Sequence, residues 1–292
     1  SCLSPIIGKM GGISADATIT KINDDTFWIV SSGAAEGFQQ RFFNMIELGK
    51  DTKFTSKSND YCGFNVAGPK SRDLLQRLSN KDLSKEAWPF FKSGSLAIAG
   101  IECVALRVSF TGDLGWELYC DEHDQLALYE VLIKSASQIG GGPVGSRALM
   151  SLRLEKGYGS WGREYSPEYW PHEVGLERLI AKKPDFINID MVKDVLSLPA
   201  REKLVVLKLN HADVMKSNAD AVGGEPIFKD GNGVGRVTSG GYGYSVDMSL
   251  ALGFVKGLES GEEVDVMVLG KPHRAIILNE PPFDPESSIL RG

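Results

Sequence analysis

The chain has 292 residues, of which 42% are hydrophobic and 24% charged, and its formal net charge is -6. These values are typical of a globular protein with more than one hydrophobic core. The charges form no long run of one sign, so we expect no nucleic-acid partner, because binding nucleic acid requires a basic stripe. No apolar run approaches the ~20 residues that span a bilayer, so we expect no membrane association.

The first two thirds of the chain combine strands and helices in irregular alternation. Hydrophobic periodicity and turn residues predict strands over residues 17–22, 26–31, 64–66, 94–99, 102–110 and 115–120. Helices are expected over residues 36–45, 71–78, 121–137 and 147–157. Because turn signals such as Asn23-Asp24-Asp25 point to hairpins, the pattern predicts an α+β fold with antiparallel sheets.

After about residue 196 the chain changes to closely spaced short strands. They are predicted over residues 203–209, 226–228, 233–239, 249–255, 263–269 and 274–278. Val264, Val266 and Val268 alternate with polar or flexible residues, which is typical of a strand with one buried face. We therefore expect an antiparallel barrel or sandwich of about a hundred residues. The predicted division is a domain region of residues 1–196 followed by a domain of residues 197–292.

Several common site types find no support in the sequence. The four cysteines are far apart and form no CxxC pair, so neither a disulfide framework nor a zinc site is expected. A reducing compartment, the cytosol or the mitochondrial matrix, fits this cysteine usage. The segment 140–145 is glycine-rich but lacks the dinucleotide spacing, so we expect no flavin or nicotinamide site within this chain. The four histidines are scattered, and we expect no metal site.

Three charged residues are candidates for function. Asp16 precedes an apolar alternating run, where it either caps a turn or serves a site. Glu117 lies between aromatic residues in a strand, where a carboxylate costs free energy unless it is paired or exposed on an edge. Arg147 begins a helix, where the macrodipole disfavours a cation, so it is either solvated or placed for an external anion.

Longer motifs give these residues a context. The strings GGISADATITKI, VSFTGDLGWELY, RALMSLRLEKGYGSWG and PDFINID occur in order, followed by VGRVTSGGYGYSVDMSLALGFV and PPFDP. With these motifs the chain resembles the folate-dependent aminomethyltransferase family, which includes the T-protein of the glycine cleavage system. The resemblance is strongest to the C-terminal folate module of dimethylglycine and sarcosine dehydrogenases, and it covers nearly the whole chain.

The resemblance implies a fold of two intertwined folate-binding domains followed by a C-terminal barrel, arranged around tetrahydrofolate. It implies that Asp16 is the catalytic acid, facing the N5 and N10 region of the folate, and that Glu117 binds the pterin ring. Further folate-binding residues implied in the same way are Ser32, Gly33, Phe110, Leu118, Tyr119, Arg147 and Arg178. Arg147 corresponds to a cation near the glutamate end of the folate.

The chain departs from the family pattern in three places. Ala15-Asp16 stands where T-proteins have two acids, and Arg178 stands where an aromatic residue is usual, although arginine can also stack. The family also carries further sequence before the GGI motif, so we expect that an N-terminal portion is missing here.

The activity implied by the resemblance is transfer of a one-carbon unit from a methylated amine, such as dimethylglycine or sarcosine, to tetrahydrofolate. The product is 5,10-methylenetetrahydrofolate, and the chain is then the folate module of a dehydrogenase or oxidase. FAD is expected only if a separate or missing N-terminal flavin domain exists. One alternative is a stand-alone aminomethyltransferase with a lipoyl carrier partner, or a folate-dependent demethylase. Another is a catalytically silent regulatory module of the same fold.

Overall fold

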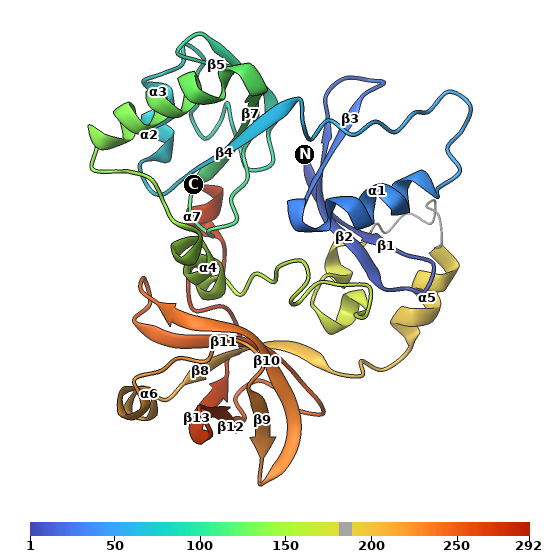
Figure 1. Ribbon diagram of the computed structural model, residues 1–292, viewed down its shortest axis with the longest axis vertical. Helices are drawn as coiled ribbons and strands as arrows, with labels where there is room; N and C mark the ends of the chain where they lie inside the picture. The colour runs from blue at the N-terminus through green and yellow to red at the C-terminus, as the bar shows by residue number, and fades with distance from the viewer. Residues whose placement is uncertain (181–188) are drawn as a thin grey trace.

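Three antiparallel sheets form the framework of the molecule and surround its centre (Figure 1). The structure is a computed structural model that describes residues 1–180 and 189–292. The motif PDFINID lies outside the described residues except for its last two positions. The prediction of an α+β fold with antiparallel sheets is confirmed.

The first sheet has the strand order β1-β2-β3 and is followed by a helix. Its elements are β1 (Cys2–Ile7), β2 (Ile13–Lys21), β3 (Phe27–Ser31), a short 3-10 turn (Gly33–Ala35) and α1 (Glu36–Asn44). The predicted hairpin is present, and Asn23 accepts a hydrogen bond from the backbone of Asp25 in its turn. Ser31 donates a hydrogen bond to the buried Gln39, which ties α1 to the sheet.

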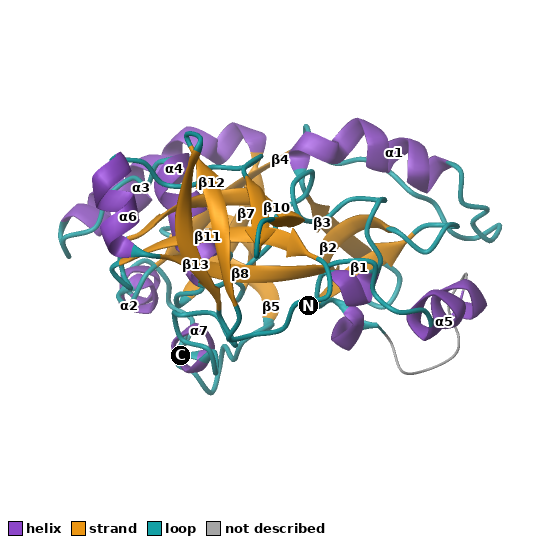
Figure 2. Ribbon diagram, turned by 90° about the horizontal axis from the view of Figure 1, so that it is seen from below, coloured by secondary structure: helices purple, strands orange, loops and turns teal. Residues whose placement is uncertain are grey.

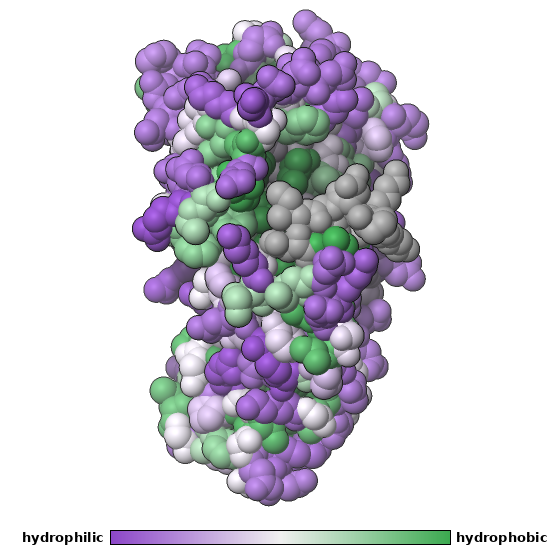
Figure 3. Space-filling view, turned by 90° about the vertical axis from the view of Figure 1, so that its right-hand side faces the viewer, coloured by the Kyte–Doolittle hydropathy of each residue, from purple (hydrophilic) through white to green (hydrophobic). Residues whose placement is uncertain are grey.

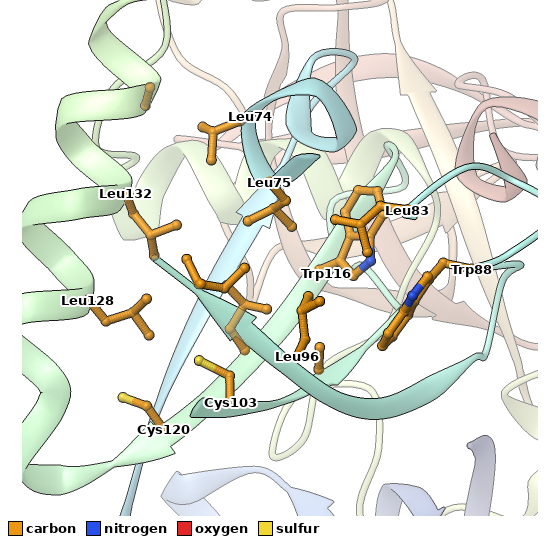
Figure 4. Packing of buried hydrophobic residues seen from close by; sticks show 14 of the residues in the cluster. Leu74, Leu75, Leu83, Trp88, Leu96, Cys103, Trp116, Cys120, Leu128 and Leu132 are labelled. Carbon is orange, nitrogen blue, oxygen red and sulfur yellow. The ribbon is translucent and has the colours of Figure 1, made fainter. Parts of the chain in front are cut away.

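The second sheet has the order β4-β7-β6-β5 and packs one face against helices. Its elements are β4 (Tyr61–Ala67), α2 (Ser71–Gln76), β5 (Ser93–Ile98), β6 (Ile101–Leu106), β7 (Gly115–Asp121), a 3-10 turn (Glu122–Asp124) and α3 (Gln125–Ser137). Figure 4 shows leucines of α2 and α3 meeting Trp116 and Cys120 of β7 in one apolar core. Because strand residues alternate between faces, Glu117 and Tyr119 lie on the opposite face of the sheet.

Three cysteines that are distant in sequence lie side by side in this sheet. Cys120 pairs with Cys62 on one neighbouring strand and with Cys103 on the other. Burial raises the pKa of Cys103 to about 12, and Cys120 adds to this shift. The Cys103 thiol is therefore protonated, and poorly nucleophilic, at neutral pH.

The C-terminal strands close into a barrel with the order β10-β11-β8-β13-β12-β9. They are β8 (Lys203–Leu209), β9 (Pro226–Lys229), β10 (Asn232–Gly243), β11 (Met248–Val255), β12 (Glu263–Val268) and β13 (Lys271–Ile277). The sequence was compatible with a barrel or a sandwich, and the closed strand order shows that this domain is a barrel. Two short helices, α6 (His211–Ser217) and α7 (Ser288–Arg291), were not among the predicted elements.

A long connection between the second sheet and the barrel returns to the first sheet. It contains α4 (Ser146–Glu155), two 3-10 turns (Pro171–Glu173 and Glu177–Leu179) and α5 (Ile189–Ser197). Ile13 of β2 is fully buried against Tyr169 of this connection and Phe254 of the barrel, and its N–H donates to the Tyr169 carbonyl at 3.1 Å. One small core thus joins the first sheet, the connection and the barrel. The predicted division at residues 196 and 197 falls at the end of α5 and stays a prediction.

Two further views locate the helices and the apolar surface. In the perpendicular view, α1 and α4 lie on one side of the strands, while α5 and α7 lie on the other (Figure 2). On the side of the molecule that carries α1 and α5, apolar side chains gather in the middle and hydrophilic ones cover the upper end (Figure 3). Within the described residues, none of the helices is both long and apolar enough to cross a membrane.

Candidate functional site

The first element of the candidate site is the carboxylate of Asp16 on β2. Its Oδ1 atom is buried and has no hydrogen-bond partner among the described residues. Burial raises the pKa of Asp16 to about 6, and a hydrogen bond from its own backbone offsets part of this shift. A desolvated carboxylate with an unused acceptor atom destabilises the folded chain. Such a group is therefore a candidate for binding or catalysis.

The raised pKa of Asp16 predicts a pH-dependent cost in stability. Below its ordinary pKa of 3.8, Asp16 is protonated in both the folded and the unfolded chain, so it lowers the free energy of unfolding no more than a neutral side chain would. Once the pH has risen through about 6, the carboxylate is charged in both states and its full destabilising effect applies. Since each pKa unit is worth about 1.4 kcal/mol, Asp16→Asn should stabilise the protein by about 3 kcal/mol at pH 7.5 and hardly at all at pH 3.5. Urea unfolding at the two pH values measures this difference. Asp25→Asn, in the exposed turn of the same sheet, should show no such pH dependence; equal stability of Asp16→Asn and wild type at pH 7.5 would contradict the burial of the charge.

Two half-buried tyrosines, Tyr158 and Tyr165, lie in the connection after α4. Burial raises the pKa of Tyr165 to about 12, and the charge of the nearby Asp16 adds to this shift. Burial also raises the pKa of Tyr158, whose ring stacks on Phe110 with centroids 6.1 Å apart. The positive charge of Arg178, whose side chain is exposed, opposes both of these shifts.

The second acid, Glu117, is held by a neighbour on its own strand. The Tyr119 hydroxyl donates to Glu117 Oε2 at 2.7 Å. Burial raises the pKa of Glu117, and this hydrogen bond opposes the rise. The Tyr119 ring lies over Gly63 of β4, where an added Cβ atom would stand 2.9 Å from the ring. Tyr119 also contacts the Trp28 ring at 6.1 Å in an edge-to-face arrangement, so the orientation of the carboxylate is fixed by packing.

Trp28 contacts Tyr119, the hydrogen-bond partner of Glu117, and lies in the same sheet as Asp16. It pairs with Thr20, so by strand alternation its side chain lies on the same face of the sheet as that of Asp16. Asp16 and Thr20 are four residues apart, or about 13 Å along the strand. The two carboxylates therefore belong to one central region but lie toward different ends of it.

The side chains of this region are partly accessible, yet burial is the largest cause of the upward pKa shift of each ionisable group. This holds for Asp16, Glu117, Tyr119, Tyr158 and Tyr165. Each of these side chains is therefore largely removed from water, yet keeps part of its surface accessible to a bound molecule. Two carboxylates and several aromatic faces suit a flat, nitrogen-rich ring with N–H donors. Within the described residues, no three His, Cys, Asp or Glu side chains gather in a way that could hold a metal ion.

The remaining residues proposed from the sequence have different surroundings. Ser32 follows the last residue of β3, and because Ala17 pairs with Ser31, it comes next to Asp16. Gly33 is exposed, with open space where a Cβ atom would stand. Arg147 is exposed on the first turn of α4.

Leu118 differs from the expectation that it lines the same pocket as Glu117. Its side chain is 0% exposed and belongs to the core under α2 and α3, on the opposite face of β7. Strand alternation is the physical reason, since neighbouring residues point to opposite faces. The Leu118 side chain therefore points away from Glu117, and its main chain lies in a strand that is paired on both sides.

Three residues of the site were not predicted, namely Trp28, Tyr158 and Tyr165. Tyr158 lies within the motif RLEKGYGSWG, so the sequence contained a signal for it. Trp28 and Tyr165 lie in the site because distant segments pack together, which local patterns do not show.

Comparison with known proteins identifies the two parts of the chain. The model of the GCVT N-terminal domain matches residues 2–184. The model of the glycine cleavage T-protein C-terminal barrel domain matches residues 203–284.

Individual relatives agree with this assignment. Human mitochondrial dimethylglycine dehydrogenase is 33% identical over 285 residues, which cover 96% of this chain and 32% of that protein. The aminomethyltransferase of Thermoanaerobacter pseudethanolicus is 27% identical over 273 residues, covering 92% of this chain and 72% of that protein. The crystal structure of the glycine cleavage system aminomethyltransferase T from Bartonella henselae has the same fold, with a TM-score of 0.81 at 22% identity over 97% of this chain and 76% of that one.

The chain spans about a third of the length of its dimethylglycine dehydrogenase relative and most of the length of its aminomethyltransferase relative. Both domains of the family are present, in the family's order, and they account for most of the residues. The chain therefore belongs to the aminomethyltransferase family of the glycine cleavage T-protein.

Proposed function

We propose that the chain binds tetrahydrofolate in its central region and promotes transfer of a one-carbon unit to it from a methylated amine such as dimethylglycine or sarcosine. The observation that carries the proposal is the pair of desolvated carboxylates, Asp16 and Glu117, on sheet faces that Trp28 and Tyr119 bring into contact. The similarity to dimethylglycine dehydrogenase over 96% of the chain supports the choice of amine.

Each acid has a distinct task in this proposal. Tetrahydrofolate, when bound, supplies the nitrogen that accepts the carbon. Glu117 accepts N–H hydrogen bonds from the pterin edge, because Tyr119 occupies Oε2 and leaves the rest of the carboxylate for a ligand. Asp16, whose Oδ1 lacks a partner among the described residues, orients the reacting nitrogen, stabilises positive charge and accepts or returns a proton.

Oxidation of the amine requires chemistry that the proposed residues do not supply. Dimethylglycine dehydrogenase is about three times as long as this chain, and we infer that a flavin domain with FAD, on the same polypeptide or on a partner, performs this step. The relatives named as mitochondrial favour the mitochondrial matrix, and the cytosol is the other compartment proposed from the cysteine usage.

A second candidate is a stand-alone aminomethyltransferase acting with a lipoyl carrier protein. It is favoured by the match to 72% of the length of a bacterial aminomethyltransferase. Transfer that depends on an aminomethyl-lipoyl carrier would favour this candidate, and transfer that depends on an amine-oxidising flavoprotein would favour the first.

The direct test is calorimetric titration with tetrahydrofolate of the wild-type chain and of Glu117→Gln. Glutamine removes the negative charge and one acceptor, so the dissociation constant should rise by about 10- to 100-fold, since hydrogen bonds to charged groups are worth about 1.5–3 kcal/mol. Glu122→Gln, in the exposed turn that follows the same strand, should bind like the wild type. No heat with the wild type would contradict the proposed function, and equal affinity of Glu117→Gln would remove Glu117 from the site.

A further inference from the structure

Glu164 is a fully buried carboxylate at the junction of the barrel and the central region. It is 0% exposed, as is its ion-pair partner Arg153 on α4, whose Nη1 lies 3.1 Å from Glu164 Oε2. The same oxygen accepts a hydrogen bond from the backbone N–H of Ser160 at 2.9 Å. Arg153 also donates to the carbonyl of Tyr158 at 2.8 Å. One half of the carboxylate thus holds the segment 158–165.

The other half of the carboxylate is held by the barrel. Thr238 Oγ1 donates to Glu164 Oε1 at 2.6 Å, and the Ser239 hydroxyl donates to the same oxygen. Consecutive residues of a regular strand point to opposite faces, so two neighbouring hydroxyls do not normally reach one atom. Here the pairing register of β10 with β11 shifts between Val237 and Ser239, which leaves Thr238 as the extra residue of a β-bulge. The bulge turns both hydroxyls toward Glu164.

The segment that Glu164 holds carries Tyr158 and Tyr165, two half-buried tyrosines of the candidate site. The N–H groups of Glu164 and Tyr165 both donate to the Ser160 carbonyl at 3.1 Å, which closes a tight loop. The Tyr165 ring lies over Gly159, where an added Cβ would stand 2.6 Å from the ring, and the Gly159 N–H donates to its hydroxyl at 3.3 Å. A movement of Glu164 therefore moves Tyr165, whose segment continues to Tyr169 and its hydrogen bond with Ile13 of β2, the strand that carries Asp16.

We propose that Thr238 and Ser239 are positioning residues of the folate site: the bulge of β10 fixes Glu164, and Glu164 fixes the loop at residues 158–165 that carries Tyr158 and Tyr165. The inference rests on the proposed function and adds that the barrel helps to position residues of the folate site. A purely stabilising role explains the geometry less well. Burying an ion pair seldom stabilises a fold more than apolar side chains of similar volume would, whereas a network with fixed geometry specifies one arrangement.

Variants of barrel residues that lie outside the candidate site test this inference. Thr238→Val keeps the shape of the side chain and removes its hydroxyl, Ser239→Ala removes the other hydroxyl, and Thr238→Ser keeps the hydroxyl and removes only the methyl group. Ser249→Ala is the matched control, because Ser249 is a buried barrel serine that donates to Asp220 instead. Amide hydrogen exchange of residues 158–165 in the unliganded protein reports the position of the loop directly, and calorimetry with tetrahydrofolate reports the site.

We expect exchange in residues 158–165 to be about tenfold faster in Thr238→Val and Ser239→Ala, because each loses a hydrogen bond to a charged group. The dissociation constant for tetrahydrofolate should rise several-fold in the same two variants, whereas Thr238→Ser and Ser249→Ala should match the wild type. A Thr238→Ser variant as impaired as Thr238→Val would show that packing alone matters and would overturn the inference. Unchanged exchange in Thr238→Val and Ser239→Ala would overturn it as well, even with normal folate binding by the wild type. Absence of folate binding in the wild type would instead contradict the proposed function.

Discussion

Replacing Asp16 with asparagine should lower the rate of folate-dependent one-carbon transfer by about 10²- to 10⁴-fold, the usual contribution of a positioned acid or base. The reason is the state of the carboxylate, which burial desolvates and which has an Oδ1 without a partner among the described residues. Charge developing next to such a group interacts with it more strongly than in water. Asparagine keeps the shape of the side chain but has neither its negative charge nor its basicity.

The pH dependence of the reaction gives this prediction a second observable. The ionised form of Asp16 is the active one in the proposed role, and its pKa is raised to about 6. The wild-type rate should therefore increase as the pH rises through about 6, and the residual rate of Asp16→Asn should lack this step.

Folate-dependent capture of formaldehyde, measured above the uncatalysed rate between pH 5 and pH 8, provides both observables. Asp25→Asn, an exposed acid on the same sheet, should retain the wild-type rate and pH profile. Asp16→Asn should still bind tetrahydrofolate, since Glu117 is unchanged. Wild-type turnover in Asp16→Asn would remove Asp16 from the mechanism and leave its burial without a functional explanation.

Much of the fold could be predicted because its elements are determined locally. The alternation of Val264, Val266 and Val268 predicts a strand with one buried face, and all three valines lie in the barrel core. The hairpin at Asn23 and the helix that became α3 follow in the same way from turn residues and helical periodicity. The strand β10 continues to Gly243, past its predicted end at residue 239, because its pairing with β11 extends through the glycines.

The candidate site could be predicted only in part, because it depends on contacts between distant segments. The strand pattern at residues 115–120 places Glu117 and Tyr119 on one face, and applied strictly it also excludes the Leu118 side chain from that face. The burial of Ile13, which lies on the same strand as Asp16, depends on residues 169–176, some 150 positions along the chain, which no local pattern reveals. For the same reason the partners of Glu164 could not be found from the sequence, because they lie on α4, in its own loop and on a bulged barrel strand.

The buried pair of Arg153 and Glu164 should also dominate the response of the fold to mutation. Arg153→Met keeps a long side chain but leaves Glu164 as a buried carboxylate without a cation, and such a loss typically costs about 3–5 kcal/mol in the free energy of unfolding. Arg153 also donates a hydrogen bond to the Tyr158 carbonyl, and this bond is lost in the same variant. The barrel hydroxyls of Thr238 and Ser239 and the Ser160 N–H still bond to the acid, so the cost should lie within this range and not above it.

Urea unfolding of Arg153→Met, of Glu164→Gln and of the double variant measures the coupling between the two side chains. Each single variant should be strongly destabilised, and the double variant should lose less than the sum of the two, because removing the second charge relieves the first. Arg163→Met is the matched control, since Arg163 is exposed in the same loop and its loss should change stability by no more than about 0.5 kcal/mol. Strict additivity of Arg153→Met and Glu164→Gln would mean that the two groups do not stabilise each other, and Glu164 would then be held by its hydrogen bonds to Thr238, Ser239 and Ser160.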